Sequence, residues 1–314
     1  MSVQAPMNLG QVRVIDPILT TVALGYQPPQ NVGNYLFPRV PVQVSGGQVL
    51  EFGKEAFVLY NSRRAPGAAT KRIDFGYAGK PFALVPDSLE GKVPREYLRD
   101  AAKVPGINLG SRAVRVVLNA MLLGLENDQA QLARTAANYA AGSTVALAPG
   151  SRWSDAGTTP TVDVLNGMEV VRETIGMYPN TAIISPKAFK ALQTNASITD
   201  RFKYTSHESI TTVMLQGLWD LERVFVGKAI YADPNGGAMT DVWGTDVVLA
   251  YVPLQASSLE EPSYGYTYAM DGNPMVEQPY YDNNPKSWIY PVTYERAPVL
   301  SGIAAGYLIQ TASS

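Results

Sequence analysis

A stretch from Gln48 to Val85 limits the possible folds most, because it reads as an arm of two extended limbs with no core of its own. In the second limb Ile73, Phe75 and Tyr77 alternate with polar or small residues, which is the period of a strand that buries one face. The first limb, Gln48 to Tyr60, alternates poorly. A two-stranded ribbon by itself is marginal in water. We therefore expect another surface to cover the arm, and a second copy of the chain is the simplest candidate.

The tip of this arm is basic and loop-like. Residues 61–70 form a connection that is too long for a tight hairpin, and basic residues lie within it and just beyond it. Such a cluster is a solvated loop, or it binds acids on a neighbouring subunit or an internal polyanion. The arm favours the intersubunit role. We predict that six residues make this contact: Arg63, Arg64, Lys71, Arg72, Phe75 and Tyr77.

The composition fits a protein whose surface is covered by partners. Of 314 residues 46% are hydrophobic, but only 17% are charged, against roughly 25% in typical soluble domains. A β-rich monomer has the same profile. The 25 basic and 27 acidic residues nearly cancel, so any contact with DNA would be local. Neither a signal peptide nor a membrane-length apolar stretch is evident, so we expect a chain made in the cytoplasm without membrane contact.

Few residues suggest chemistry. The chain has no cysteine and one histidine, His207, which excludes disulfides, thiolate nucleophiles and histidine-based zinc sites. A glycosidase uses paired carboxylates, and four acids lie in a region rich in tyrosine and proline, but the sequence fixes no separation between them. We favour an exposed loop, and we expect no catalytic site, no cofactor and no metal. The acids are Glu260, Glu261, Asp271 and Asp282.

Two segments flank the arm. Six prolines in residues 1–45 predict an extended segment with one short helix, from Pro17 to about Leu24, and residues 35–42 suit an anchor on another surface more than a central strand.

After the arm, Ser111 is a good N-cap, residues 112–141 contain no proline, and Gly142 suits a helix end. This helix would be roughly 45 Å long. Its polar side includes Glu126, and its apolar stripe, interrupted at Asp128, comprises Val114, Leu118, Met121, Leu125, Leu132 and Ala136.

Residues 143–160 are loop-like and mark a domain boundary, after which helices and strands alternate. The predicted elements are a helix Val162–Ile175 closed by Gly176, a strand Ala182–Ser185, a helix from Pro186 to about Gln193 capped by Ser185, a helix Ile210–Trp219, the strands Arg223–Tyr231 and Val242–Pro253, and further strands from Ser287 on.

Four segments of this second half, residues 161–189, 198–204, 226–231 and 243–251, together with the order of elements, carry a family resemblance. The chain resembles the major capsid protein of tailed bacteriophages, whose fold is shared with encapsulins and the herpesvirus capsid floor domain. The resemblance covers roughly residues 31–310.

The resemblance implies an α+β fold, the tailed-phage major capsid fold. Its parts would be an N-terminal arm (1–45), an extended β-hairpin loop (46–84), a peripheral domain (85–160) with the spine helix at about 112–141, an axial α/β domain (161–285) and C-terminal strands that return to the peripheral domain (286–314).

The resemblance also implies a function, namely a structural protein that self-assembles through hexamers and pentamers into an icosahedral shell around double-stranded phage DNA. The extended loop would lie over the adjacent subunit, and many small interfaces would add up. The implied partners are further copies, a portal, a possible cement protein, and packaged DNA in non-specific proximity. Some family members begin with a scaffolding segment that a protease removes, whereas this sequence starts almost directly at the arm. A separate scaffolding protein is therefore expected, or a chain that has already been processed, although Met1 argues against processing. The implied location is the virion capsid, after assembly in the host cytoplasm.

Two other interpretations remain open. An encapsulin-type nanocompartment shell would enclose an enzyme cargo, and the contents of purified particles would distinguish it from a phage capsid. A β-rich polysaccharide-active enzyme would use the carboxylates in residues 260–282, and their mutation to amides would abolish its turnover.

Overall fold

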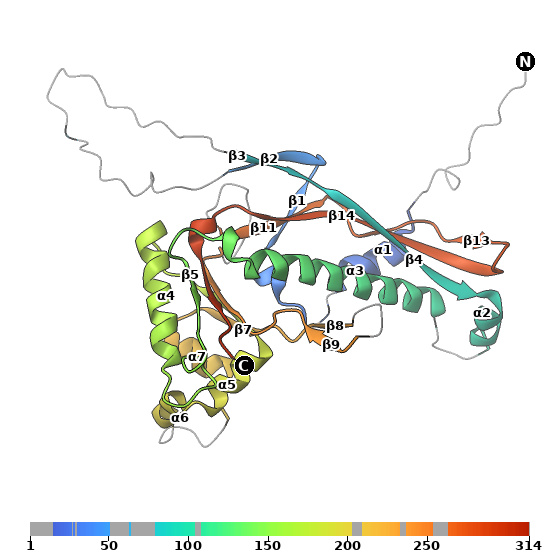
Figure 1. Ribbon diagram of the computed structural model, residues 1–314. Coiled ribbons are helices and arrows are strands. Elements are labelled where there is room, and N and C mark those ends of the chain that lie inside the picture. The colour runs from blue at the N-terminus through green and yellow to red at the C-terminus, as the bar shows by residue number, and fades with distance from the viewer. Residues whose placement is uncertain are drawn as a thin grey trace, which may run out of the picture.

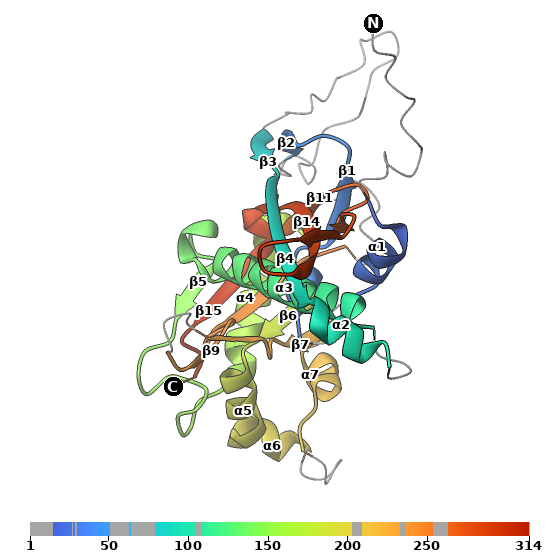
Figure 2. The ribbon, with the colours of Figure 1, turned by 90° about the vertical axis from the view of Figure 1, so that its right-hand side faces the viewer.

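The computed structural model describes residues 15–26, 28, 30–50, 63, 79–103, 108–202, 209–232, 237–253 and 263–313. Helices and strands are mixed, and most strands belong to two sheets, one of six strands and one of five. Figures 1 and 2 agree in placing the six-stranded sheet above the long helix α3 (Leu109–Arg134), and the helices α5 (Pro186–Thr194) and α6 (Ala196–Phe202) below it. None of the described helices is both long enough and apolar enough to cross a membrane.

Strand β14 (Ser287–Leu300) organises the six-stranded sheet. One edge of β14 pairs antiparallel with β4 (Val85–Pro94) over ten positions, and the other edge pairs in turn with β13 (Tyr280–Asp282), β12 (Met275–Val276) and β11 (Gly265–Met270). Strand β1 (Arg39–Val42) runs parallel to β11 at the outer edge. Pro41 is compatible with this strand because an edge strand leaves one side unpaired. The predicted anchor, residues 35–42, is therefore an edge strand preceded by the fully buried Leu36 and Phe37.

The long helix α3 (Leu109–Arg134) ends earlier in the sequence than predicted. It begins three residues earlier, where the Asn108 side chain accepts a hydrogen bond from Ser111 N, and it ends seven residues before Ala141. Thr135 is extended, and a 3-10 turn, η3 (Ala136–Asn138), follows. The Tyr139 hydroxyl donates to the Ala133 carbonyl, one of the carbonyls that a helix end leaves without a backbone partner. Local sequence did not reveal this tyrosine cap.

The apolar stripe of α3 packs under the six-stranded sheet. Val114, Leu118, Met121 and Leu125 are buried there with residues of β11, β12, β14 and helix α1 (Pro17–Leu24). The predicted position of α1 is confirmed, and Asp16 caps it by accepting from Ile18 N and Leu19 N. Ala136, assigned to the stripe from the sequence, lies beyond the helix and is exposed.

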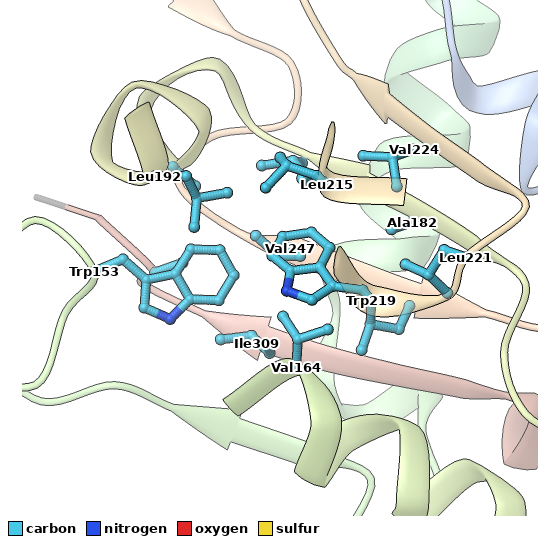
Figure 3. Packing of buried hydrophobic residues seen from close by; sticks show 14 of the residues in the cluster. Trp153, Val164, Ala182, Leu192, Leu215, Trp219, Leu221, Val224, Val247 and Ile309 are labelled. Atoms are coloured by element: carbon cyan, nitrogen blue, oxygen red, sulfur yellow. The ribbon is translucent and has the colours of Figure 1, made fainter. Parts of the chain in front are cut away.

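The five-stranded sheet is buried on both faces. Its order is β5 (Thr144–Ala146), β15 (Gly306–Gln310), β10 (Val247–Ala250), β6 (Thr181–Ile184) and β7 (Arg223–Val226). All four residues of β6 and of β10 are buried, which is typical of a sheet covered on both sides. One face packs against α4 (Pro160–Ile175), α5 (Pro186–Thr194), α6 (Ala196–Phe202) and α7 (Thr212–Trp219). The rings of Trp153 and Trp219 lie among the aliphatic side chains of this core (Figure 3).

The other face of this sheet packs against the end of α3 and the N-terminal segment. Ile183, Val248 and Leu308 of the sheet share a core with Ala130 and Ala133 of α3. Leu36, Phe37 and Trp243 complete the same core. The spine helix thus joins the two sheets, with its first half under one and its last turns against the other.

Several predicted elements of this half are confirmed. Helix α4 ends at Gly176, which adopts the left-handed conformation (φ 75°), and the Ser185 hydroxyl caps α5 by accepting from Ala188 N. The single strand predicted over 223–231 is instead two strands, β7 and β8 (Ile230–Ala232), and β8 pairs with β9 (Met239–Asp241). The break falls at Gly227, where a Cβ would lie 2.2 Å from Cδ1 of Trp243.

The two sheets divide the chain differently from the predicted domain boundaries. Strands β11, β12 and β13, predicted inside an axial domain that ends at 285, belong to the six-stranded sheet with β14. Strand β15, predicted to return to the peripheral domain, lies between β5 and β10 in the five-stranded sheet, and β5 itself was expected in the peripheral domain. Pairing between strands far apart in sequence decided this division, and local sequence carries no signal for it.

Candidate functional site

The base of the arm is a separate two-stranded antiparallel sheet. Strands β2 (Gly46–Leu50) and β3 (Gly79–Ala83) pair antiparallel from Gly46↔Ala83 to Leu50↔Gly79, and neither pairs with another described strand. The Phe82 ring stacks on Tyr268 of the six-stranded sheet, with ring centroids 4.3 Å apart. Gly47 admits this ring, because a Cβ there would lie 2.9 Å from Phe82 Cε1. The base of the arm is therefore fixed to the sheet, and helix α2 (Arg95–Ala101) follows β4 at its far end (Figure 1).

Most of the predicted contact residues lie beyond the described part of the arm. Arg63 is described and exposed. Outside the described residues lie Arg64, Lys71, Arg72, Phe75 and Tyr77. The intersubunit contact therefore stays a prediction, and what the structure adds is the geometry of the arm base.

A buried carboxylate holds the N-terminal segment to the body. Glu126 of α3 is 1% exposed, although the sequence placed it on the polar side of the helix. Its Oε1 accepts from Val32 N at 2.9 Å and from Trp243 Nε1 at 2.7 Å, and its Oε2 accepts from Gly33 N at 2.8 Å. One side chain thus joins the spine helix, the 3-10 turn η1 (Gly33–Tyr35) and the Trp243 turn before β10. Burial raises the pKa of Glu126, and the three donors act in the opposite direction.

A second polar side chain, one turn further along α3, extends this network. Gln129 is fully buried, and its Nε2 donates to Asn34 Oδ1 at 3.0 Å and to Thr267 Oγ1 at 2.8 Å. The Thr267 hydroxyl in turn donates to the Phe37 carbonyl. Sequence reasoning missed this cluster. The available signal was Gln129 itself, a polar residue four positions after Leu125 on the apolar stripe.

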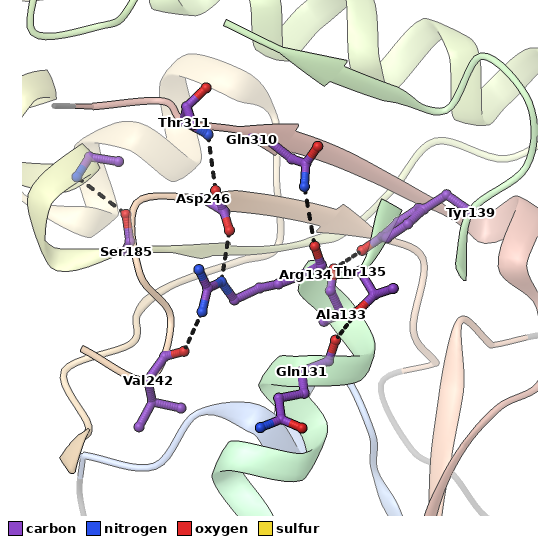
Figure 4. Close-up of polar contacts among 11 residues, drawn as sticks. Gln131, Ala133, Arg134, Thr135, Tyr139, Ser185, Val242, Asp246, Gln310 and Thr311 are labelled. Atoms are coloured by element: carbon purple, nitrogen blue, oxygen red, sulfur yellow. Dashed lines mark hydrogen bonds and ion pairs between the residues drawn. The ribbon is translucent and has the colours of Figure 1, made fainter. Parts of the chain in front are cut away.

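An ion pair fixes the end of α3 to the five-stranded sheet (Figure 4). Arg134 Nε lies 2.7 Å from Asp246 Oδ2, and Arg134 Nη1 donates to the Val242 carbonyl. The other oxygen of Asp246 accepts from Thr311 N at 3.0 Å. Gly244, with φ 55°, leaves room for the guanidinium, since a Cβ there would lie 2.1 Å from Arg134 Nη2. These contacts join α3, β10 and β15.

The residues considered for chemistry form no site in the described structure. Asp271 and Asp282 each accept a backbone amide hydrogen in a turn, from Gly272 N and Asn284 N. His207, Glu260 and Glu261 lie outside the described residues. Within the described ranges, no three acidic or histidine side chains gather in a way that could hold a metal ion.

Comparison with known proteins gives the family. No family model matches the chain. The major capsid protein of Burkholderia phage BcepMu is 35% identical over 306 residues, which are 96% of this chain and 98% of the relative. A phage-related protein from Bordetella bronchiseptica RB50 has 49% sequence identity and a TM-score of 0.84, over 96% of this chain and 99% of that one. The encapsulin of Synechococcus elongatus PCC 7942 is 14% identical with a TM-score of 0.50, over 98% of this chain and 91% of that one, and shares the fold alone. The extended identity to BcepMu shows that this chain belongs to the family of phage major capsid proteins, the structural proteins of the capsid shell.

Proposed function

We propose that copies of this chain assemble through hexamers and pentamers into an icosahedral shell that encloses double-stranded DNA. One observation carries the mode of assembly. The β2–β3 ladder is anchored at Phe82 and pairs with no other described strand. A two-stranded ribbon is marginal alone, and a neighbouring subunit supplies the missing surface.

In this proposal the loop over residues 46–84 lies across the adjacent subunit and contacts it through Arg63, Arg64, Lys71, Arg72, Phe75 and Tyr77. The unit built on the five-stranded sheet is the axial one and meets its copies at the centre of each capsomer, and the unit built on α3 and the six-stranded sheet is peripheral. Many such small contacts repeat around the shell and add up.

The partners follow from the same proposal. A portal, a separate scaffolding protein and a cement protein would bind the shell, which forms in the host cytoplasm. DNA lies near the inner surface without sequence-specific contact, consistent with 25 basic and 27 acidic residues. The chain has no catalytic role. The named capsid relative favours a phage capsid over an encapsulin compartment.

The test replaces residues 51–78 with Asn-Gly, joining Leu50 to Gly79. Because those two residues face each other in the ladder, a two-residue turn closes it without changing the register. The subunit should keep its circular dichroism spectrum and thermal midpoint, but should form no closed particles by negative-stain microscopy and sedimentation. Closed particles from this variant would overturn the proposed role of the arm.

A further inference from the structure

A buried oxygen beside Glu126 has no hydrogen-bond donor in the described part of the chain. Gln129 is fully buried, and its amide nitrogen donates to Asn34 and Thr267, but its Oε1 accepts from none of the described groups. Leaving a buried acceptor without a donor destabilises a protein, so such an atom in a packed core requires an explanation. The groups around Gln129 identify the donor.

Thr267 fixes the orientation of the Gln129 amide. The Thr267 hydroxyl carries one hydrogen and donates it to the Phe37 carbonyl at 3.0 Å. It can therefore only accept from Gln129, so the amide atom that lies 2.8 Å from Thr267 Oγ1 is the nitrogen and not the oxygen. Gln129 Oε1 is consequently the amide atom that lies against Gly33.

Glu126 Oε2 lies against the same glycine. A Cβ on Gly33 would overlap Gln129 Oε1 and would lie 2.9 Å from Glu126 Oε2, so the two oxygens converge on one side of this residue. Both carboxyl oxygens of Glu126 already accept hydrogen bonds, Oε1 from Val32 N and Trp243 Nε1 and Oε2 from Gly33 N. Two acceptor oxygens that face each other repel unless a hydrogen lies between them. A protonated carboxyl group carries such a hydrogen.

The surroundings of Glu126 favour the neutral acid. Its side chain is 1% exposed, and this burial raises the pKa of Glu126. Within the described ranges no cation pairs with its carboxyl group. Charged and phenolic groups of the surrounding elements have other contacts: Arg134 pairs with Asp246, Arg296 pairs with Asp87, and the rings of Tyr35, Tyr268 and Tyr139 stack on Phe225, Phe82 and Tyr264.

We propose that Glu126 is protonated in the folded subunit and donates this proton to Gln129 Oε1, and that loss of the proton to solvent loosens the junction between the two sheets. The junction comprises residues 32–37, the Trp243 turn and the part of α3 around Glu126. Residues 32–37 lead into β1 of the six-stranded sheet, and the Trp243 turn leads into β10 of the five-stranded sheet. One carboxyl group thus holds segments of both units. The inference concerns the single subunit and does not depend on how copies assemble.

The physical reason for the loosening is the cost of a buried charge. An ionised Glu126 would lie in a core without a cation and next to an amide oxygen that repels it. Its three hydrogen-bond donors offset part of this cost. The remainder favours conformations in which the carboxylate reaches water, and these require residues 32–37 to move away from α3.

A carboxyl titration tests the proton. Infrared spectra of the full chain contain the carbonyl stretch of protonated carboxyl groups, and the difference between wild type and Glu126→Gln isolates Glu126. The difference between wild type and Glu173→Gln isolates an exposed glutamate of α4 as the matched control. We expect the Glu126 band to disappear at a higher pH than the Glu173 band. Equal midpoints would overturn the inference.

Two variants distinguish a shared proton from burial alone. Gln129→Met removes the acceptor oxygen and keeps an unbranched side chain of similar length, so it should lower the Glu126 midpoint by about one pH unit, the equivalent of one hydrogen bond. Asn34→Ala removes a partner of the Gln129 nitrogen and leaves Oε1 in place, so it should leave the midpoint unchanged. No change in Gln129→Met, or an equal fall in both variants, would overturn the hydrogen bond to Gln129.

A third variant decides if Gln129→Met does not fold. Thr267→Val keeps the shape of the side chain but removes the hydroxyl that orients the Gln129 amide. The amide can then turn its NH2 group towards Glu126, where it stabilises the ionised carboxylate. The Glu126 midpoint should fall again, and an unchanged midpoint would contradict the proposed orientation and the shared proton.

Hydrogen exchange tests the junction. The Val32 and Gly33 amides donate to Glu126, so their protection, corrected for the intrinsic effect of pH on exchange, reports whether the junction is closed. Between the ordinary pKa of 4.5 and the folded midpoint, protection should fall by up to about tenfold per pH unit, and it should level off above that midpoint.

Two controls accompany this exchange experiment. Glu126→Gln does not titrate, so protection of the same amides should not change with pH. The amides of the buried strand β6 report unfolding of the whole subunit and should keep their protection in both proteins. A fall in Glu126→Gln as large as in wild type, or no fall in wild type, would overturn the proton-dependent loosening.

Discussion

The two sheets of this subunit use their surfaces in opposite ways. In the five-stranded sheet every residue of β6 and β10 is buried, with helices on one face and the end of α3 on the other. In the six-stranded sheet β4 is exposed at most of its ten positions, and no described helix packs on the side that carries Glu90 and Glu295. One sheet is covered on both faces by its own chain, and the other has an open face, on which no described helix packs.

This difference separates folding from assembly. A sheet buried on both faces contributes to the stability of the single subunit, because its apolar area is removed from water within one chain. An open, charged face contributes little to that stability and remains available to a neighbour. Substitutions in the first sheet should therefore change the unfolding free energy, and substitutions on the open face of the second should change assembly alone.

We expect the largest effect from substitutions of two tryptophans, one in each sheet's half of the subunit: Trp219 for the five-stranded sheet and Trp288 for the six-stranded sheet. Trp219→Ala removes a ring that is 1% exposed in the core of the five-stranded sheet, and should lower the unfolding free energy by about 3–5 kcal/mol. Trp288→Ala removes a ring that is 39% exposed on β14, and should cost about 1–2 kcal/mol. Urea unfolding of the unassembled subunit measures both, and equal losses would contradict the comparison.

A smaller effect is expected at Glu126, which joins the N-terminal segment to both units. Glu126→Gln replaces one carboxylate oxygen by an NH2 group, which cannot accept a hydrogen bond. At least one of the three N–H groups that donate to Glu126 therefore loses its partner. The unfolding free energy should fall by about 1–3 kcal/mol. The exposed Glu173→Gln on α4 is the control and should change it by less than about 0.5 kcal/mol. An unchanged unfolding free energy in Glu126→Gln would show that these hydrogen bonds do not stabilise the subunit.

The same residue predicts a pH dependence. Because burial raises the pKa of Glu126 above its ordinary value of 4.5, the folded state keeps the proton to a higher pH than the unfolded state. Its contribution to stability is full below 4.5 and is lost as pH rises through the folded pKa. The stability difference between wild type and Glu126→Gln should therefore shrink as pH rises over this window. Urea midpoints at a series of pH values give this stability difference. A difference that grows as pH rises would contradict a raised pKa of Glu126.

The smallest effect is expected on the open face. Tyr280→Phe removes the hydroxyl that donates to Glu90, in an exposed position. The unfolding free energy should change by less than about 0.5 kcal/mol, because solvent replaces this bond. A loss as large as that of Trp288→Ala would show that the open face belongs to the subunit core.

The sequence predicted the elements whose signals are local. The helix start at Pro17, Gly176 after α4, and Ser185 before Pro186 each act within one turn of helix, and all are confirmed. The end of α3 was predicted too late because the residue that satisfies its last turn, Tyr139, lies beyond the helix and acts through its side chain.

Of the candidate site, the basic arm tip and the need for a covering surface were predicted from the sequence, while the buried hydrogen-bond cluster of Glu126 and Gln129 was not. Glu126 resembles any exposed helical glutamate until Val32 and Trp243, 94 and 117 residues away in sequence, supply their hydrogen-bond donors. The division of strands between the two sheets had no local signal either, because a strand carries the same alternation whichever sheet it joins.

The sequence by itself thus determined the short helix at Pro17, the long spine helix and the alternating α/β half, since periodicity, caps and turn residues act over a few positions. Only the tertiary structure decided which strands share a sheet, that a carboxylate is buried at the junction of three elements, and that no described helix packs on one face of the six-stranded sheet. Those properties depend on contacts between segments far apart in the chain, and such contacts exist only once the backbone has folded.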